Sequence, residues 1–184
     1  TCISTEEIFV EVQIWERFTK IISDRIRHIT SGRNKNNELG PMIVPENRDK
    51  VEAHIKEVQD SCTIIRGNSD GEASYLSPAL IIDPPSDSRV VNEETFGPVL
   101  TVRPFNDENE LFDLVHKTGY GLSASIFGKN RKRIERISSQ IKTGNISVND
   151  VMTHYGIASL PFGGEGQSGL GKSHGPEGLR SLCR

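Results

Sequence analysis

Cysteine has the strongest nucleophilic chemistry of any side chain in this sequence, and it occurs at Cys2, Cys62 and Cys183. Cys2 precedes a polar run and a strand pattern, which favours an exposed thiol that could act as a nucleophile. The competing interpretation is a small buried filler, as most free cysteines are. Cys62 lies in the apolar run 62–65, where core packing is expected, and Cys183 next to the last residue is expected to be unreactive. An odd number of widely spaced cysteines predicts neither a disulfide framework nor a zinc site.

Two aromatic segments could bind or enclose a ligand. Glu94 and Phe96 stand in the run 93–98 (EETFGP), just before a strand pattern. The carboxylate could hold a polar ligand group, or the run is a solvated acidic turn. Phe162 lies between Pro161 and a glycine pair, where it could line an apolar pocket or plug the core. The residues alone leave these alternatives open.

The five histidines show no HExxH or HxxxH spacing, so we predict no metal site. His154 and His174 could assist Cys2 as a cysteine-hydrolase dyad, although no third group is placed to orient them. A thiol esterase that uses Cys2 without a cofactor therefore remains an alternative function.

Two nucleotide-binding patterns occur near the end of the chain. The run 166–173 matches GxxxxGK[ST], and 164–169 matches GxGxxG. Both patterns require a strand before them and a helix after them. The run 160–165 contains a proline and cannot be a central strand, and 174–176 (HGP) is a poor helix start. We interpret the segment as a glycine-rich loop that permits sharp turns.

Length and composition restrict the remaining possibilities. The 184 residues suit one domain, and a net charge of −3 argues against a nucleic-acid partner. The sequence has no apolar run long enough to span a membrane and no signal peptide, so we expect an intracellular protein, cytoplasmic by default. The chain opens at Thr1 without a methionine, and we expect it to be truncated at both ends.

Strand and helix patterns alternate along the chain. Hydrophobic spacing predicts strands at 8–12, 62–65, 99–102, 122–127 and 145–149, and helices at 13–29, 51–58, 108–117 and 131–142. The run 75–83 contains Pro78, which predicts an edge or extended segment. The alternation predicts an α/β fold with parallel strand pairs, in one domain over 1–184.

Four segments, taken in order, carry a family resemblance that covers essentially the whole chain. They are 1–4 with the strand 8–10, then 93–99, then 120–127, and last 144–150 leading to 160–171. Together they resemble the catalytic domain of the aldehyde dehydrogenase superfamily, and the run 159–175 is most similar to its fatty-aldehyde-type branch. The resemblance implies a largely parallel sheet flanked by helices. It also implies that the family's N-terminal Rossmann-type cofactor domain is absent from this chain.

The resemblance assigns a role to each candidate residue. Cys2 matches the nucleophile that forms a thiohemiacetal and then a thioester as an aldehyde is oxidised to a carboxylic acid. Glu94 matches the glutamate that holds the nicotinamide ribose, Phe96 matches the aromatic side chain near that ring, and Phe162 matches an aromatic side chain lining the aldehyde pocket. The implied cofactor is NAD or NADP, bound mainly by the missing domain. The implied full-length protein is a homo-oligomer.

The missing half of the site leads to two expectations. We expect the isolated chain to be inactive, because the cofactor domain and its catalytic groups lie outside it. The alternative is a non-catalytic short form that binds full-length subunits. Attachment of the full-length protein to a membrane is left open.

Overall fold

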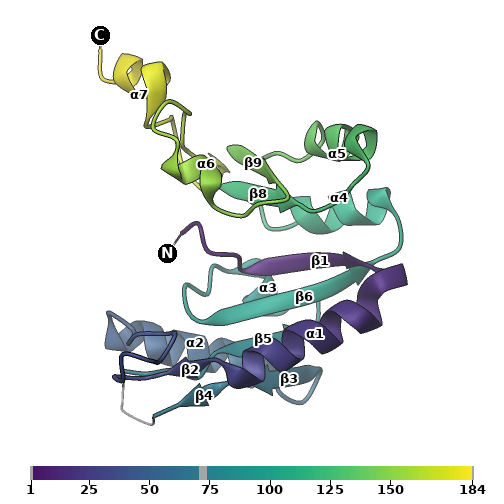
Figure 1. Ribbon diagram of the computed structural model, residues 1–184, viewed down its shortest axis with the longest axis vertical. Coiled ribbons are helices and arrows are strands. Elements are labelled where there is room, and N and C mark those ends of the chain that lie inside the picture. Colours follow the sequence, from purple (N-terminus) through teal and green to yellow (C-terminus); the bar gives the residue numbers. More distant parts are fainter. Residues whose placement is uncertain (1, 71–73, 184) are drawn as a thin grey trace. The chain divides into compact units, whose positions relative to one another are not determined.

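The computed structural model describes residues 2–70 and 74–183, and it divides the chain into two compact units (Figure 1). We call Thr5–Asp107 the sheet unit, and Thr1–Ser4 with Glu108–Arg184 the loop unit. Each unit is described by itself below. The expectation of one domain over 1–184 stays a prediction.

The sheet unit is built on four strands in the order β1-β6-β5-β3. They are β1 (Glu7–Glu11), β3 (Thr63–Arg66), β5 (Ala79–Ile82) and β6 (Val99–Phe105). β6 runs parallel to both β1 and β5, and β3 pairs antiparallel with β5. A separate short parallel pair joins β2 (Thr30–Ser31) to β4 (Asn68–Ser69). The predicted strands at 8–12, 62–65 and 99–102 are confirmed, with shifted ends.

Helices cover both faces of this sheet. They are α1 (Trp15–His28), which follows the 3-10 turn η1 (Val12–Ile14), α2 (Pro45–Val58) and α3 (Arg89–Asn92). Successive residues of a strand point to opposite sides, so β5 contributes to two clusters. Leu80 packs with Val10 and Val102 on the α1 side, whereas Ile81 packs against Val51 and its neighbours on the α2 side. Leu80 and Ile81 have no exposed surface.

The spacing of apolar residues explains how α2 packs. Pro45 stands in its first turn, where a missing N–H leaves no hydrogen bond unmade. Val51, Ile55 and Val58 follow at intervals of four and three residues, so they form one stripe along the helix. All three are buried, which confirms the predicted stripe.

The prediction for 75–83 was wrong, because β5 is a central strand and not an edge. Pro78 immediately precedes the strand, so its missing N–H removes no hydrogen bond from the ladder. Its carbonyl still accepts the Gly67 N–H at 2.8 Å. A proline just outside a strand is compatible with a fully buried position, and the sequence pattern did not separate that case from an interruption.

The loop unit contains shorter elements. They are α4 (Glu108–His116), β7 (Tyr120–Gly121), β8 (Ser123–Ile126), α5 (Arg131–Ser138), β9 (Asn145–Val148), α6 (Thr153–Gly156), β10 (Glu165–Gly166) and α7 (Gly175–Ser181). β8 pairs parallel with β9, and β10 pairs antiparallel with β7. The predicted α/β class with mostly parallel pairing is therefore confirmed. No helix in the described residues is long and apolar enough to cross a membrane.

Candidate active site

The Glu94–Phe96 loop of the sheet unit has an unusual backbone. Phe96 adopts a positive φ of 52°, a left-handed conformation that costs a non-glycine residue about 1–2 kcal/mol. Its N–H donates to Oε1 of Glu6 at 3.1 Å. Glu94 is exposed, and 44% of the Phe96 surface is exposed. The Glu94 carboxylate and the Phe96 ring are therefore both exposed to a ligand, while the Phe96 backbone is fixed by its hydrogen bond to Glu6.

Glu6 holds this loop from the residue before β1. Burial raises the pKa of its carboxyl, the Phe96 N–H opposes that shift, and the nearby Glu94 carboxylate adds to it. The Glu6 carbonyl accepts the Thr101 N–H at 2.9 Å. Glu6 therefore connects the start of the sheet to the loop.

Helix α2 contacts the other side of the same loop. The Lys50 ammonium donates to the carbonyl of Glu94, and the His54 ring lies 3.1 Å from the Thr95 hydroxyl. Gly97 comes so close to α2 that an added Cβ would meet a Val51 methyl at 2.4 Å. The loop is thus fixed by side chains far from it in the sequence.

Phe162 lies half-buried in the loop unit, at the start of the glycine-rich segment. Its N–H and carbonyl both bond the backbone of Ser173, at 2.7 and 2.6 Å. Three rings surround it: Tyr155 at 5.1 Å edge-on, His174 at 5.9 Å and His154 at 6.2 Å between centroids. The structure therefore places Phe162 in an aromatic cluster.

The dyad considered for His154 does not fit its surroundings. The buried His154 has Nδ1 3.0 Å from the Ser147 hydroxyl. Its Nε2 is enclosed and finds no hydrogen-bond partner among the residues that the structure describes. Neither ring nitrogen is open to a thiol, so His154 is not placed as a base for Cys2.

The three cysteines differ in their surroundings. Cys2 is exposed, in a turn whose next residue, Ile3, is buried. Cys62 is half-buried, and its thiol donates to the Val58 carbonyl at 3.3 Å. Burial raises the pKa of the Cys62 thiol, which disfavours the reactive thiolate. The packing role predicted for Cys62 is confirmed. Cys183 is exposed near the end of α7.

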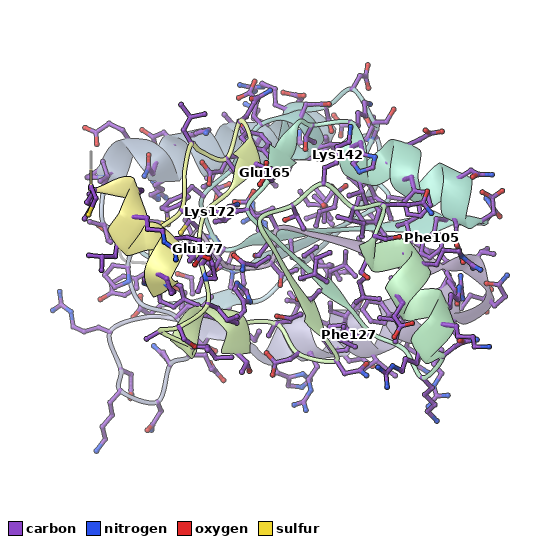
Figure 2. All side chains as sticks on the ribbon, turned by 90° about the horizontal axis from the view of Figure 1, so that it is seen from above. Phe105, Phe127, Lys142, Glu165, Lys172 and Glu177 are labelled. Carbon is purple, nitrogen blue, oxygen red and sulfur yellow. The ribbon has the colours of Figure 1, made fainter. Side chains whose placement is uncertain are left out.

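The lysine of the GxxxxGK[ST] run is hydrogen-bonded within the glycine-rich segment. Lys172 Nζ donates to the Gly163 carbonyl and to Glu165 Oε1, each at 3.0 Å (Lys172 and Glu165 are labelled in Figure 2). The run 174–176, interpreted from the sequence as a poor helix start, does begin a helix, because α7 starts at Gly175. Pro176 occupies the first turn of α7, where proline is well tolerated.

Sequence reasoning missed the residues that hold the two loops: Glu6, Lys50, His54 and Tyr155. Lys50 and His54 are four residues apart on α2, one position before the apolar pair Val51 and Ile55. A second, polar stripe beside an apolar one was the available signal. Among the described residues, no group of three or more His, Cys, Asp and Glu side chains could hold a metal ion.

Comparisons with known proteins agree on one family. The model of the aldehyde dehydrogenase family matches residues 1–184. The 4,4'-diapolycopene aldehyde oxidase of a Methylomonas species is 33% identical over 97% of this chain and 34% of its own length. The betaine aldehyde dehydrogenase of Bacillus subtilis is 32% identical over 97% of this chain and 38% of its own length.

Solved structures agree with the sequence comparisons. The betaine aldehyde dehydrogenase of Staphylococcus aureus in complex with NAD+ has a TM-score of 0.87 at 31% identity, over 96% of this chain and 36% of that one. This chain therefore spans little more than a third of the length of these relatives. Because the family model covers every residue, the chain belongs to the aldehyde dehydrogenase family.

Proposed function

We propose that this chain supplies the nucleophile, the nicotinamide-contacting loop and part of the aldehyde pocket of a longer NAD(P)-dependent aldehyde dehydrogenase. The observation that carries this proposal is the exposed Cys2 thiol in a chain that belongs to the aldehyde dehydrogenase family, and the resemblance described above aligns Cys2 with the nucleophile. Only three residues separate Cys2 from Glu6 along the chain, and Glu6 accepts the N–H of Phe96. The sequence therefore connects the nucleophile directly to the support of the proposed cofactor loop.

The proposed reaction proceeds through covalent intermediates on Cys2. Its thiolate attacks the aldehyde carbonyl carbon, and the carbonyl oxygen becomes the oxyanion of a thiohemiacetal. The Cys2 backbone N–H would help to hold this oxyanion. Loss of hydride gives a thioester, and water then adds, releasing the carboxylic acid and the thiol. Sulfur suits both steps because a thiolate is a strong nucleophile and a good leaving group.

The residues present fit part of a nicotinamide cofactor. The exposed Glu94 carboxylate can accept hydrogen bonds but not donate them, which suits the two hydroxyls of a ribose. The partly exposed Phe96 ring offers an apolar face beside it. When bound, the cofactor supplies the hydride acceptor. Glu94 and Phe96 orient it, and the choice between NAD and NADP would rest on residues outside this chain.

Phe162 forms one wall of the proposed aldehyde pocket. Its ring is fixed by Tyr155 and by the backbone pairing with Ser173. An aromatic wall favours aldehydes with an apolar group next to the carbonyl, because their burial removes apolar surface from water. We also propose that the full-length protein is a homo-oligomer, and the similarity of 159–175 to the fatty-aldehyde-type branch stays a prediction.

The first test is Cys2→Ala in the natural full-length polypeptide that contains this sequence. Aldehyde-dependent formation of reduced nicotinamide should fall by at least about a thousandfold, as when other nucleophiles are removed. The control is Cys183→Ala, which removes another exposed thiol and should leave the rate unchanged. Measurable turnover by Cys2→Ala would refute the nucleophile assignment. A wild-type full-length protein without any aldehyde oxidation would favour the non-catalytic alternative.

The second test is Glu94→Gln, which keeps the shape of the side chain and removes its charge. We expect a KM for the cofactor raised about tenfold and a smaller change in the KM for the aldehyde, since a charged acceptor binds hydroxyls more strongly. Glu46→Gln is the control, because Glu46 is also exposed and lies in the first turn of α2. Equal cofactor KM values for Glu94→Gln and wild type would reject the ribose role.

A further inference from the structure

Helix α2 carries a polar stripe next to its apolar stripe. Lys50, His54 and Glu57 follow at intervals of four and three residues, so they share one side of the helix. Lys50 donates to the Glu94 carbonyl, the His54 ring meets the Thr95 hydroxyl, and Glu57 pairs with Arg89 at the start of α3. Every member of this stripe therefore contacts the segment 89–95.

His54 is the buried member of the stripe. Only 1% of its surface is exposed, and Thr95 is also buried at 5%. A buried polar side chain must find a hydrogen-bond partner or lose stability, and each of these two residues has the other. Lys50, by contrast, is exposed and uses only its terminal atom. The His54–Thr95 bond is the contact to this loop that lies away from water.

The charges around His54 indicate which protonation state forms this bond. Glu93 Oε2 lies 3.5 Å from Nε2 and can only accept hydrogen bonds, so the proton of the neutral ring belongs on Nε2. Nδ1 then accepts from the Thr95 hydroxyl at 3.1 Å. A second proton on Nδ1 would turn Nδ1 into a donor, so the Thr95 hydroxyl would have to rotate and accept, and the charged ring would stay buried at a cost in free energy.

We propose that His54 is a positioning residue: through Thr95, and in its neutral form, it holds the Glu94–Phe96 loop in the shape that binds the cofactor. This rests on the proposed function, in which Glu94 and Phe96 contact a nicotinamide cofactor. Phe96 provides the reason that such support is needed. Its left-handed backbone persists only where neighbours impose it, and Thr95 is the residue directly before it.

Protonation of His54 should weaken this support. Burial lowers the pKa of His54 below its ordinary 6.5, and Arg89 and Lys50 lower it further against the opposing Glu93 and Glu57. The folded state therefore binds this proton less readily than the unfolded state. The stability that His54 contributes is complete above 6.5 and is lost as the pH falls through the lowered pKa. The loop is therefore expected to loosen below 6.5, as the pH falls through the lowered pKa of His54.

The experiment compares His54→Leu and His54→Asn in the natural full-length polypeptide. The amide of asparagine can place an acceptor near the position of Nδ1 but cannot titrate. For His54→Leu we expect the Kd of the cofactor, measured by calorimetry without aldehyde, to rise about three- to tenfold, the value of one hydrogen bond. His54→Asn should restore most of that affinity. It should also reduce the rise in Kd that we expect of wild type as the pH falls below 6.5, and the remainder is expected from Glu6, whose carboxyl also titrates and accepts the Phe96 N–H.

A second pair of variants covers the case in which His54→Leu does not fold. Thr95→Val removes the hydroxyl at nearly constant shape, and Thr95→Ser keeps it. We expect Thr95→Val to raise the cofactor Kd as His54→Leu does, with faster amide exchange at residues 94–96, and Thr95→Ser to match wild type. Combined with His54→Leu, Thr95→Val should add no further effect, since the two residues share one bond.

Specific results would overturn the proposal. A cofactor Kd at the wild-type value in His54→Leu, or in Thr95→Val if His54→Leu does not fold, rejects the positioning role. An acidic rise in Kd that is as large in His54→Asn as in wild type rejects it as well. The exposed His28→Leu on α1 controls for the loss of a titrating histidine. If Glu94→Gln also leaves the cofactor Kd unchanged, the proposed function itself fails; if Glu94→Gln weakens binding, only the role of His54 is rejected.

Discussion

The two aromatic residues proposed for the site, Phe96 and Phe162, are held by different means. Phe96 lies in the sheet unit, where Glu6 and the α2 side chains secure its loop on the edge of a buried core. Phe162 lies in the loop unit, where paired backbone at Ser173 and a group of rings surround it. The comparison teaches that one loop depends on side chains distant in the sequence, whereas the other depends on backbone pairing and rings that are near it in the sequence.

The two units also differ in the apolar side chains that they bury. The sheet unit buries two apolar clusters, one on each face of its sheet. In the described part of the loop unit, the buried apolar side chains are Ile3, Leu111 and Ile137. Leu170, Leu179 and Leu182 of this unit are largely exposed. We therefore expect the largest effects of core substitution in the sheet unit.

The largest expected effect is that of Leu80→Ala in β5. Leu80 is fully buried, so the change should leave a cavity and reduce the free energy of unfolding by about 2–5 kcal/mol. Leu170→Ala, at a fully exposed position of the loop unit, should change it by less than about 0.5 kcal/mol. Urea unfolding with hydrogen exchange resolves both. Similar losses for the two variants would contradict the difference between the units.

A smaller effect is expected for Gly144→Ala, which tests the backbone support of Phe162. An added Cβ would lie 1.6 Å from the Gly163 carbonyl oxygen, next to Phe162, and the overpacking should cost about 1–3 kcal/mol. We also expect a higher KM for the aldehyde with an unchanged KM for the cofactor. Gly156→Ala is the control, because its Cβ would meet no atom of the described residues within 4 Å. A raised cofactor KM instead would mean that the two loops do not act separately.

The smallest effect is expected for Glu108→Gln. The Glu108 side chain links α4 to α5. The Arg136 and Arg133 guanidinium groups lower the pKa of Glu108 from 4.5 to about 2. Its contribution to stability is thus present above 4.5 and is lost as the pH falls toward 2. Because water reaches Glu108 and the two arginines, we expect the substitution to lower the free energy of unfolding by no more than about 1 kcal/mol in neutral solution.

The pH dependence of Glu108→Gln sharpens the comparison between the units. Hydrogen exchange in α4 and α5 should show that the variant loses less stability than wild type on acidification below 4.5. His54 acts on the sheet unit at higher pH, below 6.5. If Glu108→Gln kept the full acidic loss in α4, the stabilisation would belong to other carboxyl groups.

Local patterns predicted much of the fold. Two elements follow from the hydrophobic spacing of neighbouring residues: the helix with the stripe Val51, Ile55 and Val58, and the strand predicted at 145–149. The structure has both, as α2 and β9. The pattern failed where a proline stood at the start of an element. Pro78 precedes a central strand and Pro176 opens a helix, because a missing N–H costs nothing at these positions. Propensity alone does not say on which side of a boundary a proline falls.

The sequence by itself determined the family motifs, the alternation of strands and helices, and the four candidate side chains Cys2, Glu94, Phe96 and Phe162. The tertiary structure decided what holds them. His54 and Thr95 are 41 residues apart, and Glu6 and Phe96 are 90 apart. Contacts over such distances form only when a common core brings the segments together. The burial and protonation state of His54 and the left-handed backbone of Phe96 all follow from that packing.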